Sequence, residues 1–149
     1  MKDIEIIKFA NNYRNQVLEV WERSVLASHD FLKTEDFEEI KSFVQEINLN
    51  ELELYLMKIE DTIAGFVGVF EKKIEMLFIA PEYIGRGLGR KLLNFAIFTL
   101  NANKVDVNEQ NLNAVKFYIK MGFVAYERTE KDDQGKDYPL LRMQLITTK

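Results

Sequence analysis

Three glycines within five residues are the strongest chemical signal in this sequence. Gly85, Gly87 and Gly89 follow a strand-like segment and Pro81, and they precede a segment with helical periodicity. Closely spaced glycines let successive backbone N–H groups turn toward one point, and the first turn of a helix adds unpaired N–H donors and a partial positive charge. This combination predicts a cradle for phosphate groups.

The charges around these glycines favour the same interpretation. No acidic residue lies between Glu82 and Asp106, whereas that stretch contains four basic residues: Arg86, Arg90, Lys91 and Lys104. Basic side chains in the first turn of a helix are unfavourable by roughly a few tenths of a kcal/mol each. A bound dianion would reverse this penalty, so we expect an anionic ligand here rather than a tight turn alone.

Two other phosphate-binding motifs fail on spacing. A dinucleotide-binding G-x-G-x-x-G would need glycine at position 90 or 92, where Arg90 and Leu92 stand. A P-loop would need Gly-Lys followed by Ser or Thr, and this tripeptide does not occur in the chain. The cradle therefore belongs to a different kind of site.

Two segments resemble the signatures of the GNAT superfamily of N-acetyltransferases. Residues 77–93 are similar to its coenzyme A motif, Gln/Arg-x-x-Gly-x-Gly/Ala after a strand; Gly87 and Gly89 match it, and Ile84 departs from the polar first position. Residues 108–123 resemble the family's Asn-x-x-Ala-x-x-Phe-Tyr-x-x-x-Gly-Phe ending. Three shorter segments, 21–24, 28–32 and 133–141, look like those of small bacterial members of the family.

The resemblance implies acetyl-coenzyme A as cosubstrate and direct transfer of its acetyl group to an amine, with no acyl-enzyme. It also implies that the strand at 76–80 splays from the strand at 103–108 and that the pantetheine arm inserts between them, with a backbone N–H near Phe78 polarising the thioester carbonyl. The coenzyme-binding residues expected from it are Leu77, Phe78, Ile79, Ile84, Gly85, Arg86, Gly87, Leu88, Gly89, Arg90, Asn108, Asn111 and Tyr118.

Tyr118 matches the tyrosine that the family places near the coenzyme sulfur, where a phenol can donate a proton to the departing thiolate. A lysine amine, with a pKa near ~10.4, must also lose a proton before it can attack. Glu75 and His29 are both candidates for the base, and the sequence does not choose between them.

The residues expected to bind the acceptor amine are His29, Asp30, Phe31 and Tyr138. Asp137 is expected to help Asp30 attract a cationic amine, and Trp21 is expected to belong to the core. A small molecule, a peptide N-terminus and a protein lysine all remain as acceptors. Two alternative functions are an acyl-coenzyme A sensor of the same fold, which intact Tyr118 argues against, and a nucleotide-binding module.

The elements that must position these residues alternate between strand and helix. Hydrophobic periodicity predicts the order βααβββαβαββ. The predicted strands are 4–9, 52–59, 63–70, 73–79, 105–107, 123–130 and 138–146, and the predicted helices are 11–26, 34–48 with Thr34 as N-cap, one starting near Arg86, and one ended by Gly122. We expect an α/β protein with the GNAT fold: a mixed, mostly antiparallel, twisted sheet of about seven strands flanked by four helices, in a single domain over residues 1–149.

Composition excludes several other classes of function. The 149 residues contain 20 basic and 24 acidic side chains, which argues against non-specific binding to nucleic acid or to anionic membranes. The chain has no cysteine and one histidine, so we expect no metal site. It shows neither an apolar signal core nor a run of about 20 apolar residues. We expect a cytoplasmic protein, either a monomer or a homodimer.

Overall fold

The computed structural model describes residues 3–146, and its elements follow the predicted order. The strands are β1 (Ile4–Lys8), β2 (Glu53–Ile59), β3 (Thr62–Phe70), β4 (Lys73–Ile79), β5 (Lys104–Asn108), β6 (Phe123–Thr129) and β7 (Leu140–Leu145). The helices are α1 (Arg14–Ser28), α2 (Thr34–Glu46), α3 (Leu88–Phe98) and α4 (Leu112–Lys120). Short 3-10 turns occupy Asn11–Tyr13, Leu49–Glu51 and Pro81–Tyr83.

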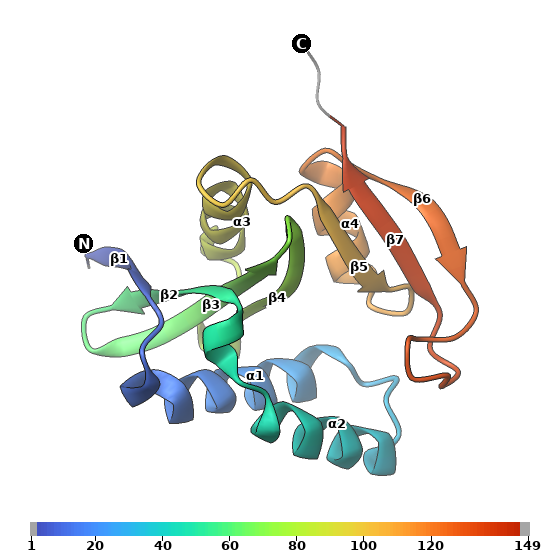
Figure 1. Ribbon diagram of the computed structural model, residues 1–149, viewed down its shortest axis with the longest axis horizontal. Helices are drawn as coiled ribbons and strands as arrows, with labels where there is room; N and C mark the ends of the chain where they lie inside the picture. The colour runs from blue at the N-terminus through green and yellow to red at the C-terminus, as the bar shows by residue number, and fades with distance from the viewer. Residues whose placement is uncertain (1–2, 147–149) are drawn as a thin grey trace.

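The seven strands form one mixed sheet in the order β1-β2-β3-β4-β5-β7-β6 (Figure 1). Every neighbouring pair is antiparallel except β4 and β5, which are parallel. The predicted mixed, mostly antiparallel sheet with four helices is therefore confirmed. β7 lies between β5 and β6, so the chain returns to fill a position inside the sheet.

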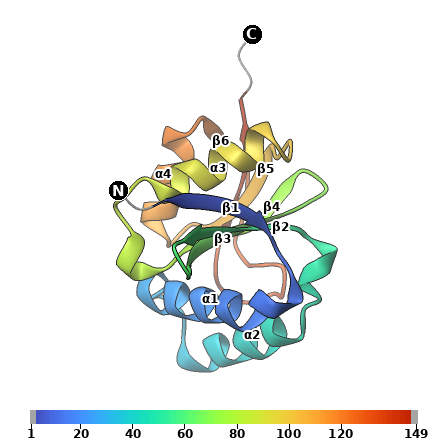
Figure 2. The ribbon, with the colours of Figure 1, turned by 90° about the vertical axis from the view of Figure 1, so that its left-hand side faces the viewer.

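Helices cover both faces of the sheet (Figure 2). On one face α3 and α4 pack over a core that includes Val67, Leu92, Leu93, Phe123 and Met143. On the other face α1 and α2 pack over a second core that includes Val17, Trp21, Leu56 and Phe66. None of the helices within residues 3–146 has the length and hydrophobicity needed to cross a bilayer.

Trp21 belongs to the core, as predicted. Its side chain is buried and its ring stacks on that of Phe37, with the centroids 5.9 Å apart. The pair joins α1 to α2 within the second core.

The starts of three helices differ from the prediction: the helix predicted from residue 11 begins with a 3-10 turn at Asn11–Tyr13 and becomes α-helical at Arg14, and the starts of α2 and α3 are wrong by one or two residues. α2 has Lys33 rather than Thr34 as its N-cap, and the cap makes no side-chain hydrogen bond. Acidic residues in the first turn, Glu35 and Asp36, stabilise this end through the helix dipole instead. α3 begins at Leu88 rather than near Arg86, because the residue before it, Gly87, has a left-handed φ of 77° that a right-handed helix cannot contain.

Gly65 of β3 lies directly against the backbone of β4. A Cβ atom at this position would be 2.6 Å from the carbonyl oxygen of Phe78 and 2.7 Å from Cδ1 of Ile79. Gly68, on the same strand, has only the flexible ends of two leucine side chains nearby, at 3.2 and 3.3 Å. Close packing of β3 on the end of β4 therefore requires glycine at position 65.

We predict that Gly65→Ala lowers the free energy of unfolding by about 1–3 kcal/mol, because the added methyl forces the strand backbones apart. Gly68→Ala, the matched control, should lower it by less, since leucine side chains can move. Urea unfolding of the two variants measures the difference. Equal stability of the two variants would show that β4 can shift freely at this point.

Candidate active site

β4 and β5 pair only at one end. The parallel register joins Lys73 to Lys104 and Ile74 to Val105, and beyond these pairs the two strands diverge. The peptide groups of Leu77, Phe78 and Ile79 that point toward β5 consequently find no partner on that strand. Backbone N–H and C=O groups are rarely left without a partner, so this stretch is suited to hydrogen-bond an extended ligand.

A β-bulge at Glu75 accompanies the divergence. Val69 of β3 pairs with Ile74 and Gly68 pairs with Met76, so Glu75 has no partner on β3. The extra residue interrupts the regular alternation that the sequence suggested for Glu75, Leu77 and Ile79, and bulges bend and twist the strand that carries them. The Glu75 side chain is partly exposed, and its carboxylate lies 4.0 Å from the ammonium of Lys73.

A network of charged side chains lies at the end where β4 and β5 still pair. Asp106 of β5, whose side chain is 14% exposed, accepts from Lys73 of β4 at 2.6 Å and from Arg142 of β7 at 2.7 Å. Burial lowers the pKa of Lys73, but the hydrogen bond to Asp106 and the negative charges around the ammonium together outweigh it, so the net shift is upward. Arg142 also contacts Asp133 of the β6–β7 loop at 2.9 Å. Three strands are thus tied together beside the point of divergence.

The glycine turn has the backbone conformation that only glycine adopts easily. Gly85 has φ 86° and Gly87 has φ 77°, and a Cβ atom on either would meet nothing within 4 Å. The requirement is therefore for the left-handed backbone rather than for space. α3 has neither a side-chain cap nor an acidic residue in its first turn, so its first amides are free to bind an anion.

A groove of about 410 Å³ joins this turn to the end of β4. The predicted coenzyme-binding residues that line it are Ile79, Ile84, Gly85, Gly87, Leu88, Gly89 and Arg90. Arg86 is exposed, and its guanidinium lies 5.2 Å from the ring centroid of Tyr83. A smaller hollow of about 260 Å³ between α1 and α2 is lined by none of the predicted site residues.

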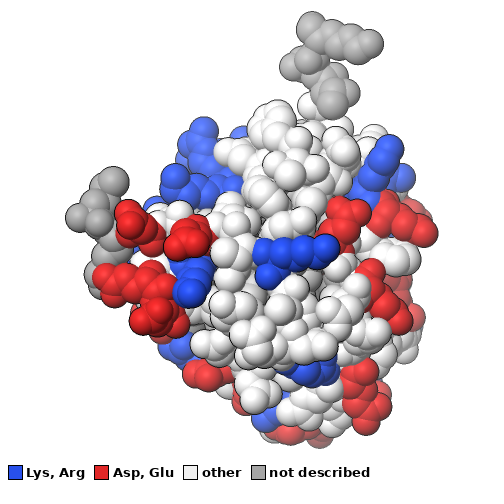
Figure 3. Space-filling model, turned by 60° about the vertical axis from the view of Figure 1, so that its left-hand side comes forward, with Lys and Arg blue, Asp and Glu red and all other residues white. Residues whose placement is uncertain are grey.

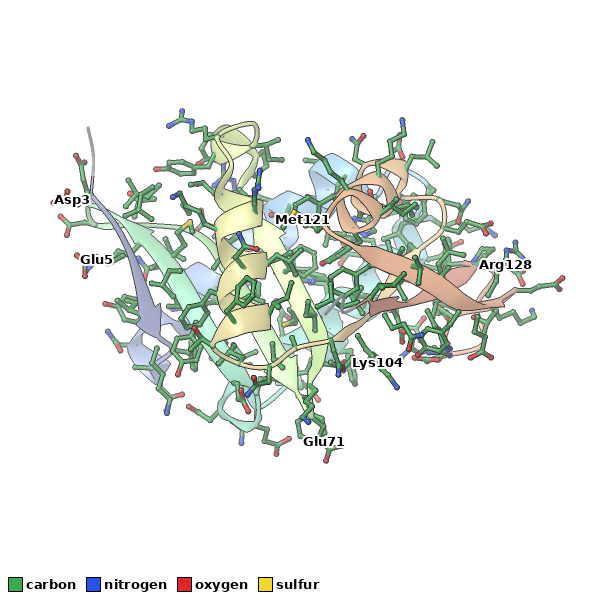
Figure 4. The ribbon with its side chains drawn as sticks, turned by 90° about the horizontal axis from the view of Figure 1, so that it is seen from above. Asp3, Glu5, Glu71, Lys104, Met121 and Arg128 are labelled. Carbon is green, nitrogen blue, oxygen red and sulfur yellow. The ribbon has the colours of Figure 1, made fainter. Side chains whose placement is uncertain are left out.

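Four further residues line the groove: Tyr83, Phe117, Lys120 and Met121. The last three come from α4 and the residue after it, and Figure 4 shows Met121 between α3 and α4. Phe117 also approaches the start of α3, with its Cζ 3.6 Å from where a Cβ of Gly89 would lie. Sequence reasoning missed this wall because it depends on how α4 packs against α3; the apolar face of α4 was the available signal.

Tyr118 lies on α4 in the core beside β5. It is 6% exposed, and its ring makes edge contacts with Phe117 at 5.2 Å and with Phe123 at 5.4 Å. Burial raises the pKa of its hydroxyl. The phenol consequently stays protonated through the physiological range, as a proton donor must.

The two predicted asparagines flank the start of α4. Asn111 is its N-cap, and the side-chain oxygen accepts from the backbone N–H of Ala114 at 3.2 Å. That contact leaves the Asn111 amide NH₂ as the group for a ligand. Asn108 ends β5 and is half-buried.

The predicted acceptor residues form a row of rings beside the α1–α2 loop. The ring centroids of His29 and Phe31 are 5.2 Å apart, and those of Phe31 and Tyr138 are 6.1 Å apart. The Tyr138 hydroxyl accepts from the backbone N–H of Lys33 at 3.1 Å and donates to the carboxylate of Asp36. The Tyr138 side chain is buried, at 7% exposure, and its hydroxyl joins the β6–β7 loop to α2.

The two aspartates predicted to attract a cation differ in their surroundings. Asp30 is exposed beside His29, whereas Asp137 points to Lys131, with its oxygen 2.7 Å from the ammonium. Asp36, which the sequence did not single out, contacts Lys136 at 3.2 Å as well as Tyr138. The hydrogen bond from Tyr138, followed by that from Lys136, lowers the pKa of Asp36.

His29 is half-buried at the C-terminal end of α1. Burial lowers the pKa of its imidazole, and the negative charge of Asp30 opposes this shift. The ring nitrogen Nδ1 is 2.7 Å from the hydroxyl oxygen of Ser28. His29 therefore carries a neutral imidazole at neutral pH. Among residues 3–146 there is no group of three side chains placed to hold a metal ion.

Residues 11–146 match the family of the acetyltransferase (GNAT) domain. The chain is 37% identical over 144 residues to the peptidyl-lysine N-acetyltransferase YjaB of Escherichia coli, covering 96% of this chain and 97% of that protein. YjaB of Salmonella typhimurium is 36% identical over 141 residues, 94% of this chain and 97% of that protein.

Solved structures agree with these sequence matches. The solution structure of apo YjaB from Escherichia coli superposes with a TM-score of 0.88 at 36% identity, covering 98% of this chain and 99% of that one. The PaiA N-acetyltransferase of Thermoplasma acidophilum, solved in complex with coenzyme A, has a TM-score of 0.67 at 20% identity and covers 97% and 99% of the two chains. The predicted fold is confirmed.

We predict that Gly87→Ala weakens coenzyme A binding, because alanine disfavours the left-handed conformation by roughly 1–2 kcal/mol and tilts the amides of the cradle. Gly135 in the β6–β7 loop has nearly the same conformation, with φ 79° and open space around it. Gly135→Ala is therefore a matched control for backbone strain. Calorimetric titration with coenzyme A should show a higher Kd for the first variant only. An equal Kd in both variants would show that the glycine turn does not contribute to coenzyme A binding.

Proposed function

The chain belongs to the GNAT family of acetyltransferases, and we propose that the amine it acetylates is the side chain of a lysine in a peptide or protein. It is an acetyl-coenzyme A-dependent N-acetyltransferase. Two relatives that match it over nearly their whole length are peptidyl-lysine N-acetyltransferases. The lysine acceptor rests on these relatives, and the observation in the structure that carries the acetyl-transfer activity is the parting of β4 from β5 beside the free amides of α3.

The fit of the chain to coenzyme A supports this function. The free amides of α3, together with Gly85 and Gly87, suit the diphosphate, and Arg90 at the groove adds positive charge. The peptide groups of β4 at Leu77 and Phe78 that have no partner on β5 suit the amides of an extended arm, while the carbonyl of Ile79 already accepts from the Ser24 hydroxyl. When bound, acetyl-coenzyme A supplies an activated thioester, and the chain's own residues bind the amine, orient it and move its protons.

Tyr118 is proposed to give its hydroxyl proton to the sulfur that leaves. Its buried phenol has a raised pKa and so is held in the protonated state. Once the proton has gone, the phenolate takes up a proton from the newly acylated nitrogen. Tyr118 thus ends the reaction in the form in which it began.

His29 is proposed to accept the first proton, the one that a lysine ammonium must lose before it attacks. Its neutral imidazole lies beside Phe31 and Tyr138, in the loop that precedes α2. Glu75, the other candidate, lies beside the ammonium of Lys73, which competes with an acceptor amine for its carboxylate. The amine thus loses two protons. His29 accepts the first, and Tyr118 accepts the second, which replaces the proton that it gave to the sulfur.

Other partners stay predictions. On the face drawn in Figure 3, acidic and basic side chains are interspersed around a broad uncharged area. Such a surface gives a polyanion no continuous basic track on that face. The expected absence of nucleic-acid and membrane partners, the monomeric or dimeric state and the cytoplasmic location stay predictions.

We predict that Tyr118→Phe lowers kcat by about 100-fold, the lower end of what a positioned proton donor contributes, and leaves the Kd for coenzyme A unchanged. Tyr126, which is 47% exposed on β6, provides the control substitution Tyr126→Phe. Release of free thiol measures turnover in both variants. Unchanged turnover by the Tyr118 variant would show that this residue does not donate the proton to the leaving thiolate.

The acceptor is tested with three amines: a lysine peptide with a blocked N-terminus, the same peptide with arginine for lysine and a free N-terminus, and free spermidine. We expect acetyl-coenzyme A-dependent thiol release, and a mass increase of one acetyl group, with the first of these. Transfer only to the α-amine or to spermidine would contradict the lysine proposal. Coenzyme binding without transfer to any amine would favour the sensor alternative.

A further inference from the structure

A short chain of hydrogen bonds runs along the last turn of α1. The Ser24 hydroxyl donates to the carbonyl oxygen of Ile79 at 2.7 Å, and the Ser28 hydroxyl donates to the carbonyl oxygen of Ser24 at 2.7 Å. The same Ser28 oxygen is 2.7 Å from Nδ1 of His29. Three neighbouring polar groups thus link the end of β4 to the imidazole ring.

The number of hydrogens at Ser28 decides the tautomer of His29. A serine hydroxyl has one hydrogen and two lone pairs, and a carbonyl oxygen can only accept. If the hydroxyl hydrogen points to Ser24, the Nδ1 contact is a hydrogen bond only when Nδ1 carries a proton. If the hydroxyl instead points to Nδ1, the 2.7 Å contact with the Ser24 carbonyl contains no hydrogen. The first arrangement makes two hydrogen bonds from these contacts and the second makes one.

The backbone on both sides of the ring is fixed as well. The N–H of His29 donates to the carbonyl of Val25 at 2.8 Å, and the carbonyl of His29 accepts from the N–H of Leu32 at 3.1 Å. The ring lies against Phe31, with the centroids 5.2 Å apart. The imidazole is therefore held by its backbone, its neighbour and its Nδ1 atom, which leaves Nε2 as the nitrogen able to accept a proton.

Ser24 relates this arrangement to the reaction centre. It is buried, and it binds the carbonyl of Ile79, the last residue of β4 and part of the wall of the coenzyme groove. Four residues of α-helix rise about 6 Å, so Ser28 lies one helical turn beyond Ser24, the residue that contacts the strand proposed to hold the pantetheine arm. Figure 1 shows the loop after α1 below the gap between β4 and β5.

We propose that Ser28 is a positioning residue that holds His29 in the tautomer with a proton on Nδ1 and a free lone pair on Nε2, an inference that rests on the proposed role of His29 as proton acceptor. When Nε2 takes a proton from the acceptor ammonium, both ring nitrogens become donors. The bond from Nδ1 to Ser28 persists in both states, so the proton moves without rotation of the ring. The proton on Nε2 then passes to water.

The chain contains a single histidine, so nitrogen-15 spectra of the imidazole report on His29 alone. Recorded on the free protein, well above the ordinary histidine pKa of about 6.5, the wild type should show Nδ1 protonated and Nε2 unprotonated. Ser28→Ala should move the ring toward the other tautomer. Ser28→Thr, which keeps the hydroxyl, should restore the wild-type spectrum, and Ser42→Ala, at an exposed serine of α2, is the matched control.

Steady-state kinetics with the blocked lysine peptide provide the second readout. Ser28→Ala should lower kcat roughly tenfold, a part of the 10²–10⁴-fold that acid–base catalysis contributes, with the KM for acetyl-coenzyme A unchanged. An unprotonated Nδ1 in the wild type would overturn the proposal, as would a changed tautomer in Ser28→Ala with an unchanged kcat. The tautomer of the wild type is measured without substrate, so this result does not depend on the acceptor. If the proposed lysine acetylation is wrong, the wild type instead shows no turnover with the lysine peptide.

Discussion

The interaction on which the active site depends is the two-residue pairing of β4 with β5. Had the parallel ladder continued past Ile74, the peptide groups at Leu77–Ile79 would be satisfied within the sheet and no ligand arm could insert there. The bulge at Glu75 bends β4 at the point where pairing stops, and Asp106 fastens both strands to β7 immediately beside it. The sheet is thus held closed at one end and open at the other, between α3 and α4 on one face and the α1–α2 loop on the other.

Local sequence was sufficient for the parts of this site that lie close together in the chain. The glycine turn, the start of α3 within two residues and the seven strands could all be predicted, because left-handed glycines and hydrophobic periodicity act over a few residues. The bulge at Glu75 could not, since it is a property of the register between β3 and β4. Phe117, Lys120 and Met121 were missed because they enter the groove only through the packing of α4.

Charged side chains also divide into those whose role is evident from neighbouring residues and those whose partners lie far away in the sequence. The basic residues near the glycine turn were evident from their spacing, whereas the contacts of Asp106 with Lys73 and Arg142, and of Asp36 with Tyr138, join residues 33 to 102 positions apart. Asp137 was expected from the sequence to help attract the acceptor amine, yet it turns to Lys131 at the surface. Which of two nearby acidic residues meets a tyrosine is decided by the path of a loop, and composition carries no information on that path.

The position of β7 has a consequence for how the enzyme is made. β7 follows β6 in the chain but lies between β6 and β5, so during synthesis on the ribosome β5 and β6 emerge before the strand that joins them exists. Until β7 arrives, Asp106 lacks Arg142, the Tyr138 anchor of the α1–α2 loop is unfinished, and two strand edges are open to other chains. The nascent protein therefore gains its catalytic geometry only after β7 has been made and has inserted between β5 and β6.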